Sequence, residues 1–381
     1  MDEPPLSDNH KAALNSLRDQ FALLDDERQP GKVHHVLPDV LLSALCAMLC
    51  GCDDFSAMAS FAKHRLKWLR EFLPMKEGPP SHDTYRNVFM MVKPSEFVEV
   101  LTEWFGSLSG EHIAIDGKAI RSSYDRNRRK CLVHLLRAWI DERSLSVGQV
   151  ACREKSNEIE AIPRLLDSLV LEGATVTIDA AGCQTAIAEQ INEGGGSYIL
   201  GLKGNQGEAH RVVSQHFDEV SIPCHAMTEE QGHGRYEKRE CWVEEDLSFF
   251  DKSWKWQGLT CVVCIRRETC RMDGRGTDGA EASVENHYYL CSTEPDAERI
   301  LSLVRSHWGI ENRCHWTLDV VFGEDASPIR DRSAAQNLST LRDLSIHLLR
   351  SHPKKASLPK KRLEAMLHPD FRAELFTHVH T

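Results

Sequence analysis

Apolar residues recur with helical spacing through the first third of the chain. From Pro38 to Phe105 nearly every segment places apolar side chains three or four positions apart, as one face of a helix requires. Gly51 follows an apolar run at the position where a glycine commonly ends a helix, and further helices are predicted to begin at Ser81 and Pro94. We therefore predict an all-helical N-terminal domain over residues 1–110.

Short apolar runs alternate with helical patterns through the centre of the chain. The predicted elements follow the order β-β-β-α-β-α-β, which is the order of a ribonuclease-H-like (RNase-H-like) mixed sheet. In that α/β fold the first and fourth strands lie side by side. The predicted strands are His112–Asp116, Cys131–Ile140, Leu145–Cys152, Thr175–Ile178 and Ser197–Leu202, and the predicted helices begin at Asn157 and Thr185.

The pattern changes again after the last of these strands. From Gly207 to about Ser292 it is strand-like, and we predict a β-rich insertion at about 207–295. The helical pattern returns at Asp296. The α/β domain is then expected over residues 111–350, followed by a basic C-terminal tail over 351–381.

Composition and length exclude some classes of protein. The chain has 381 residues, of which 41% are hydrophobic and 27% charged, an ordinary globular mixture. Its longest nearly apolar run, Val40 to Cys52, is too short to cross a bilayer, and its first ten residues lack the apolar core of a signal peptide. Thirteen cysteines without zinc-finger spacing suit a reducing compartment. We therefore expect a cytoplasmic protein that has no membrane partner.

Charge is distributed unevenly along the chain. The formal net charge is −11, which is unusual for a nucleic-acid-binding protein. Yet Gly117–Lys155 carries ten lysines and arginines against four acids, and Arg342–Arg362 carries seven against one. The two stretches could form a local anion-binding track, and the alternative is that both are ordinary solvated surfaces.

Two carboxylates end strands that the predicted fold places next to each other. Asp116 ends the first strand and Asp179 ends the fourth, so the two side chains are expected to lie close enough to share a metal ion. Carboxylate oxygens suit Mg²⁺ or Mn²⁺. Two such ions about 4 Å apart can activate water and stabilise the leaving oxygen in an in-line phosphoryl displacement.

A third carboxylate stands in a patterned helix. His307, Glu311, His315 and Asp319 are four residues apart and are predicted to form one polar ridge. This ridge could bind zinc or iron, or it could supply one catalytic carboxylate with DNA-contacting neighbours. A solvated helix face is the remaining alternative.

Several motifs occur together in the order that one family shows. They are Ile115-Asp-Gly-Lys-Ala-Ile-Arg121, Lys155-Ser-Asn-Glu158, Thr177-Ile-Asp-Ala180, Leu202-Lys-Gly-Asn-Gln206, His233-Gly-Arg235, His307-Trp-Gly-Ile-Glu-Asn312, His315-Trp-Thr-Leu-Asp319 and Phe322-Gly-Glu-Asp325. From about residue 20 to 350 the chain resembles the insertion-sequence transposases of the ISAs type, also called H-repeat-associated proteins. This resemblance implies a DDE transposase with an RNase-H-like core and a divalent-metal cofactor, namely two Mg²⁺ or Mn²⁺ ions.

The resemblance also assigns residues. It implies that Asp116, Asp179 and Glu311 are the catalytic carboxylates and the metal ligands, while Asp319, Glu324 or Asp325 are alternatives for the third ligand. Asn205 and Gln206 either reach DNA or only shape the turn that follows their strand. The candidates for DNA binding are Lys118, Arg121, Arg128, Arg129, Lys203, Asn205, Gln206, His233, Arg235, His307 and His315.

The expected function is cutting and joining of double-stranded DNA at insertion-sequence ends and at a target, in the bacterial cytoplasm and on the nucleoid when bound. A homodimer or larger assembly is expected on DNA. Two alternatives remain open at this point: a nuclease of the same fold that does not join DNA, and a non-catalytic DNA-binding protein derived from a transposase.

Overall fold

The computed structural model describes residues 5–106, 109–121, 124–125, 130–131, 133–152, 158–232, 234–271 and 282–379. The chain forms two compact units. Unit 1 comprises Met1–Leu108, Gly117–Asn157 and Glu311–Thr381, and unit 2 comprises Ser109–Asp116 and Glu158–Ile310. Each unit is therefore built from segments that are far apart in the sequence.

The N-terminal part of unit 1 is helical, as its apolar spacing predicts. Ser81 Oγ accepts a hydrogen bond from the Thr84 amide and caps the helix that follows, and Gly51 adopts a φ of 88° directly after another helix. The helices are α1 (Asp8–Phe21), α2 (Leu37–Leu49), α3 (Phe55–His64), α4 (Leu66–Leu69), α5 (His82–Met91) and α6 (Pro94–Phe105), with a 3₁₀ turn at Pro30–Lys32.

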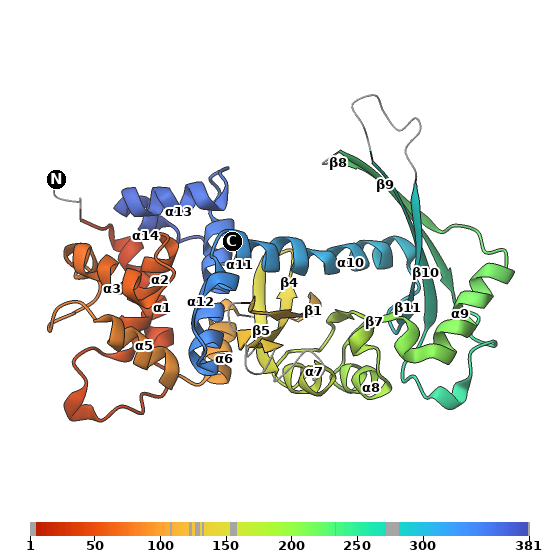
Figure 1. Cartoon of the computed structure of the whole chain (residues 1–381), viewed down its shortest axis with the longest axis horizontal. Coiled ribbons are helices and arrows are strands. Elements are labelled where there is room, and N and C mark those ends of the chain that lie inside the picture. The colour runs from red at the N-terminus through yellow and green to blue at the C-terminus, as the bar shows by residue number, and fades with distance from the viewer. Residues whose placement is uncertain are drawn as a thin grey trace. The chain divides into compact units, whose positions relative to one another are not determined.

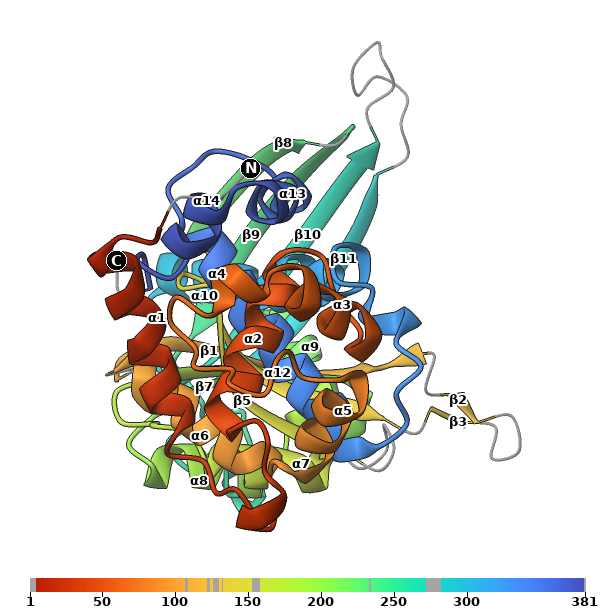
Figure 2. The ribbon, with the colours of Figure 1, turned by 90° about the vertical axis from the view of Figure 1, so that its left-hand side faces the viewer.

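The C-terminal part of unit 1 is also helical. Its longest helix, α12 (Arg332–Ser351), packs against α2, α5 and α6, and Figure 2 shows it among these helices. Most of its side chains are buried. It is preceded by α11 (Trp316–Val320) and followed by α13 (Leu358–Leu367) and α14 (Pro369–Glu374).

The basic stretch Arg342–Arg362 is not the uniformly exposed surface that its charge suggested. Arg342, Lys361 and Arg362 are buried. Lys361 donates to the carbonyls of Leu349 and His352, and Arg362 donates to the carbonyl of Met48. Buried cations need such acceptors, so these charges serve the fold rather than a phosphate backbone.

Nine strands form one mixed sheet in the order β5-β4-β1-β6-β7-β11-β10-β9-β8. Within unit 1, β4 and β5 are antiparallel neighbours. Within unit 2, β1 pairs parallel with β6, which pairs parallel with β7. The pairing of β1 with β6 confirms that the first and fourth predicted strands lie side by side. The bounds are β1 (His112–Ala119), β4 (His134–Ile140), β5 (Leu145–Cys152), β6 (Thr175–Ile178) and β7 (Ser197–Leu202); β2 (Tyr124–Asp125) and β3 (Lys130–Cys131) pair separately.

Helices cover both faces of the sheet in unit 2. Here α7 (Glu158–Leu166) and α8 (Thr185–Glu193) lie on one side, and α10 (Ala297–Gly309) lies on the other (Figure 1). Ile178 of β6 faces α7, because a Cβ added at Gly182 would meet both Ile178 and Ile162 of α7. Side chains alternate along a strand, so Thr177 and Asp179 point to the face that α10 covers.

The insertion begins with a helix. The prediction that strands begin at Gly207 is therefore wrong for the first part of the insertion. Residues Gly207–Glu219 form α9, whose buried Ala209 and Val213 stand four positions apart, as on a helix face. Four antiparallel strands follow: β8 (Ala226–Gly232), β9 (Arg235–Glu244), β10 (Cys261–Arg271) and β11 (Ser283–Cys291). Cys261 and Cys264, which have CxxC spacing, both lie in β10.

None of the helices in the described ranges is long and apolar enough to span a membrane.

Candidate functional site

Asp116 and Asp179 occupy equivalent places on neighbouring strands of unit 2. The register pairs Ile115 of β1 with Ile178 of β6, and each aspartate is the next residue of its strand. Neighbouring strands lie about 4.8 Å apart, so the two carboxylates stand side by side at one edge of the parallel pair. The sequence predicted that Asp116 ends its strand. β1 instead continues to Ala119, so Asp116 lies within the strand.

The loop that follows Asp179 is held by several polar contacts. Asp179 Oδ1 accepts a hydrogen bond from the Ala181 amide at 2.9 Å, which orients the exposed carboxylate. Asn205 donates to the Ala180 carbonyl at 2.6 Å, and Gln206 donates to the Cys183 carbonyl at 2.9 Å. The two amide side chains therefore shape the loop beside Asp179, which is one of the two roles that the sequence left open for them.

A hydroxyl group links two histidines beneath this aspartate. Thr177 Oγ1 lies 2.9 Å from His112 Nε2 and 2.9 Å from His307 Nδ1. Burial lowers the pKa of His307 to about 4, although the Asp179 charge opposes this shift. His307 is therefore neutral near pH 7 and joins α10 to the strand that carries Asp179.

Glu311 lies in unit 1, in a turn that differs from the regular helix predicted from the sequence. Residues Ile310–His315 form a π-helix, which takes more residues per turn than an α-helix. The four-residue spacing therefore does not give one polar ridge. Glu311 is exposed, His315 is buried and Asp319 is half-buried.

The acids considered as alternatives to Glu311 belong to a network of ion pairs in unit 1. Lys118 Nζ lies 3.0 Å from Glu324 Oε2 and 3.5 Å from Asp325 Oδ1, and it also pairs with Asp319. Arg121 Nε lies 3.2 Å from Asp325 Oδ2. These carboxylates already have cationic partners from the chain itself, whereas Glu311 presents its side chain to solvent.

The centre of this network is fully buried. Arg137 Nη2 lies 3.1 Å from Glu324 Oε1, and Arg137 Nε lies 3.3 Å from Asp343 Oδ2. Burial by itself would raise the pKa of Glu324, but Arg137, Lys118 and Arg342 outweigh it and hold this pKa well below its usual range. Sequence analysis missed this network. Its one signal was Arg137, a charge in the middle of an otherwise apolar strand.

The remaining candidates for DNA binding differ widely in exposure. Arg121, Lys203 and Arg235 are exposed, whereas Lys118 and His315 are buried. Burial removes most of the surface that a phosphate contact would need, so the exposed arginines and lysine are the better candidates. Arg128, Arg129 and His233 lie outside the described residues.

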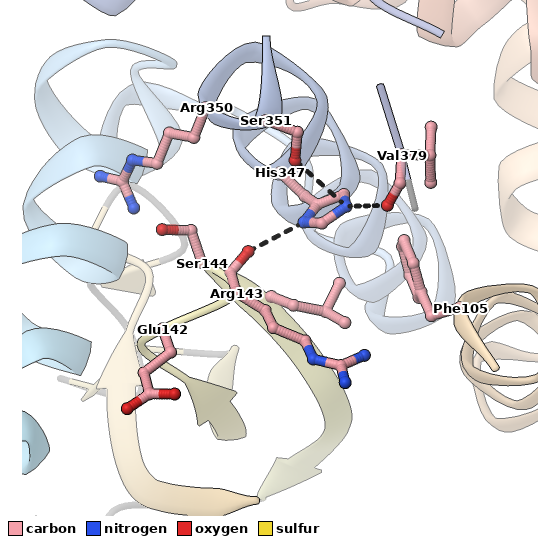
Figure 3. A pocket seen from close by; sticks show the side chains of 9 residues that line it. Phe105, Glu142, Arg143, Ser144, His347, Arg350, Ser351 and Val379 are labelled. Carbon is pink, nitrogen blue, oxygen red and sulfur yellow. Dashed lines mark hydrogen bonds between the residues drawn. The ribbon is translucent and has the colours of Figure 1, made fainter. Parts of the chain in front are cut away.

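Unit 1 also contains a cavity of about 480 Å³. Figure 3 shows His347 at its wall, where Nδ1 donates to the Arg143 carbonyl at 2.9 Å and Nε2 lies 3.4 Å from the Val379 carbonyl. Arg350 lines it too, and one of its nitrogens donates to the Arg313 carbonyl and Thr317 Oγ1. Among the described residues, none of those predicted from the sequence as site residues lines this cavity.

Comparison with known proteins agrees with the motifs. Residues 107–349 match the Transposase DDE domain family, and residues 18–105 match the DDE_Tnp_1-associated family. The "H repeat-associated putative transposase YhhI" of Escherichia coli (strain K12) is 34% identical over 374 residues, which are 95% of this chain and 98% of that protein. The "Putative transposase YncI" of Escherichia coli O157:H7 is 36% identical over 350 residues, which are 89% of this chain and 88% of that protein.

One solved structure is also similar. It is the cryo-EM structure of the piggyBac transposase synaptic complex with hairpin DNA, with a TM-score of 0.40, 9% identity and coverage of 97% of this chain and 80% of that one. The family match spans most of the chain, and two relatives match it over nearly their whole length. The chain therefore belongs to the DDE transposase family, together with the H repeat-associated relatives.

Proposed function

We propose that this chain is a DNA transposase that cuts and joins double-stranded DNA at the ends of an insertion sequence. The observation that carries the proposal is the parallel pairing of β1 with β6, which brings Asp116 and Asp179 together in a chain of the DDE family. The strand order β5-β4-β1-β6-β7 supports an RNase-H-like core, because the first and fourth strands are neighbours.

The donor groups fit a divalent metal cofactor. Asp179 uses one oxygen for the Ala181 amide, while its side chain remains exposed. Asp116 supplies a second hard oxygen donor beside it, and we infer that Glu311 supplies the third. When bound, two Mg²⁺ or Mn²⁺ ions would activate the attacking oxygen and stabilise the leaving oxygen in each phosphoryl transfer.

The protein's own residues then have positioning roles. The link from His307 through Thr177 to His112 fixes the strand that carries Asp179, and Asn205 and Gln206 fix the loop after it. The exposed Arg121, Lys203 and Arg235 would contact phosphate oxygens. We further propose that the chain acts in the cytoplasm and as a homodimer or larger assembly on DNA.

The test is cleavage of a duplex that carries the element's ends, in Mg²⁺, by the full chain. Asp116→Asn and Asp179→Asn each keep the side-chain shape and remove one charge, and each should lower the cleavage rate by roughly a thousandfold or more. Glu189→Gln removes a charge from an exposed position of α8 and serves as the matched control. Full activity of Asp116→Asn would refute the metal-dependent mechanism.

A second readout separates the transposase from its alternatives. Joining of the cleaved end to a target plasmid is expected from the wild-type chain. Cleavage without joining would identify a nuclease. Selective binding of the ends without cleavage in Mg²⁺ or Mn²⁺ would identify a non-catalytic DNA-binding protein.

A further inference from the structure

Three side chains with metal-binding atoms meet near the C-terminal end of unit 1. His352 directly follows α12, Glu374 ends α14, and His378 lies one helical turn further on. Each residue offers one ligand atom, and these atoms all lie within 4.8 Å of one another. His352 Nε2 is 3.6 Å from Glu374 Oε2, and His378 Nε2 is 3.9 Å from Glu374 Oε1.

His352 provides an independent indication that a ligand belongs here. Its side chain is 5% exposed, yet its buried Nε2 has no hydrogen-bond partner. The nearest carboxylate oxygen is too far away for a hydrogen bond. The ring is held in place by edge contacts with Phe371 at 4.7 Å and with His378 at 5.1 Å between ring centroids. A buried polar atom without a partner is unfavourable, and an ion bound to Nε2 in place of the ring proton would satisfy it.

We propose that His352, Glu374 and His378 bind a divalent transition-metal ion, with zinc preferred, and that the ion ties α14 to the end of α12. Two imidazoles and one carboxylate are a ligand set that zinc takes in proteins, with a fourth position left for water. Tetrahedral zinc with bonds of about 2.1 Å separates its ligand atoms by about 3.4 Å. The three ligand atoms, which all lie within 4.8 Å of one another, would therefore need to approach by at most about 1.4 Å.

The charges around the site are compatible with this assignment. Burial lowers the pKa of His352, and the Lys361 ammonium adds to this effect while Glu374 opposes it. The ring is thus neutral near pH 7, which is the form that binds metals. Glu374 is 47% exposed and His378 27%, so an ion can enter from solvent.

One hydrogen bond must change when the ion binds. The Lys354 amide donates to His352 Nδ1 at 3.2 Å, which leaves the ring proton on Nε2 in the metal-free chain. Binding through Nε2 moves this proton to Nδ1, and the Lys354 amide, in an exposed segment, then bonds to water.

The test is a Zn²⁺ titration of the full chain in competition with a chromogenic chelator. Millimolar Mg²⁺ is present, so that it occupies any site made only of carboxylates and keeps zinc out of it. We expect one zinc ion per chain that is lost in His378→Ala and bound at least about tenfold more weakly by Glu374→Gln. His368→Ala, an exposed histidine next to α14, is the matched control and should bind as the wild type does.

A second measurement distinguishes the loss of the metal site from the loss of folding in a variant. Zinc should raise the melting temperature of the wild type and of His368→Ala but not that of His378→Ala, while circular dichroism of the metal-free proteins should be the same. The proposal is overturned if the wild type binds no zinc under these conditions, or if His378→Ala binds it with wild-type stoichiometry and affinity.

Discussion

Two groups of carboxylates in this chain contain similar residues but have different surroundings. In unit 2, Asp116 and Asp179 stand side by side on parallel strands, and Asp179 is exposed. In unit 1, Glu324 and Asp343 are buried and are paired with Arg137. The comparison shows that the fold can place carboxylates of one chain in very different electrostatic surroundings. The second group receives cations from the chain itself, whereas Asp179 of the first group is exposed.

Lys118 illustrates the difference most directly. It follows Asp116 by two residues on the same strand, so the sequence suggested a role beside the catalytic acids. Its ammonium instead lies within 4.0 Å of Asp319, Glu324 and Asp325. Closeness in sequence therefore does not tell which acids a cation will neutralise.

The largest effect is expected at Glu311, the proposed third metal ligand. The comparison variant changes Asp319, which pairs with Lys118 in unit 1. Glu311→Gln should lower DNA cleavage by roughly a thousandfold, as loss of a ligand would, while leaving DNA binding intact. Asp319→Asn removes one of three partners of Lys118 and should lower cleavage by less than about tenfold. Rates measured on the same duplex in Mg²⁺ would decide the assignment. The opposite ranking would show that Asp319 is the ligand.

The buried group should determine stability. Glu324→Gln keeps the shape but leaves Arg137, which is fully buried, without its main counter-charge. We expect a loss of about 3–5 kcal/mol in the free energy of unfolding. Asp325→Asn at a 22% exposed site should cost about 1 kcal/mol or less. Urea unfolding of the full chain measures both, and equal midpoints for the two variants would contradict a structural role for Glu324.

Stability in unit 2 should depend on pH through His307. Its pKa is lowered by burial to about 4, against about 6.5 in the unfolded chain. Between these values the unfolded chain binds a proton that the folded chain does not. The contribution of His307 to stability therefore falls as the pH is lowered from 6.5 to 4, by up to about 3 kcal/mol.

Urea unfolding of the wild type and of His307→Gln at pH 7 and at pH 4.5 would test this dependence. The stability advantage of the wild type over the variant should be smaller at the lower pH. An advantage that is the same at both pH values would mean that His307 does not titrate in this window.

The smallest effect is expected at the C-terminal basic stretch, because only part of it is exposed. Lys355 and Lys360 are exposed, so Lys355→Glu combined with Lys360→Glu should weaken DNA binding by a few fold and lower its salt dependence. Lys252→Glu, an exposed charge outside both basic stretches, is the control. Binding measured between 50 and 200 mM salt would test this. Equal losses for the double variant and the control would remove any specific role for the stretch.

Local patterns predicted several elements correctly, and the reason is physical. The strands Leu145–Cys152, Thr175–Ile178 and Ser197–Leu202 have the predicted bounds, and α6 begins at Pro94 as predicted. Side-chain alternation and helical spacing are set by neighbours within one turn or a few residues, so they can be read from sequence alone. The same rules failed at Gly207, where α9 precedes the strands, and at Ile310–His315, where the π-helix changes the spacing.

The sequence by itself determined the family, the two aspartates on neighbouring strands and most of the helices that surround them. Only the tertiary structure decided which charged side chains are buried and paired with one another inside the protein. Lys118 meets Glu324 across a separation of 206 residues, and Arg137 meets it across 187. Such pairs depend on how the whole chain folds and on burial, which strengthens electrostatic interactions and removes water, and no local pattern encodes either.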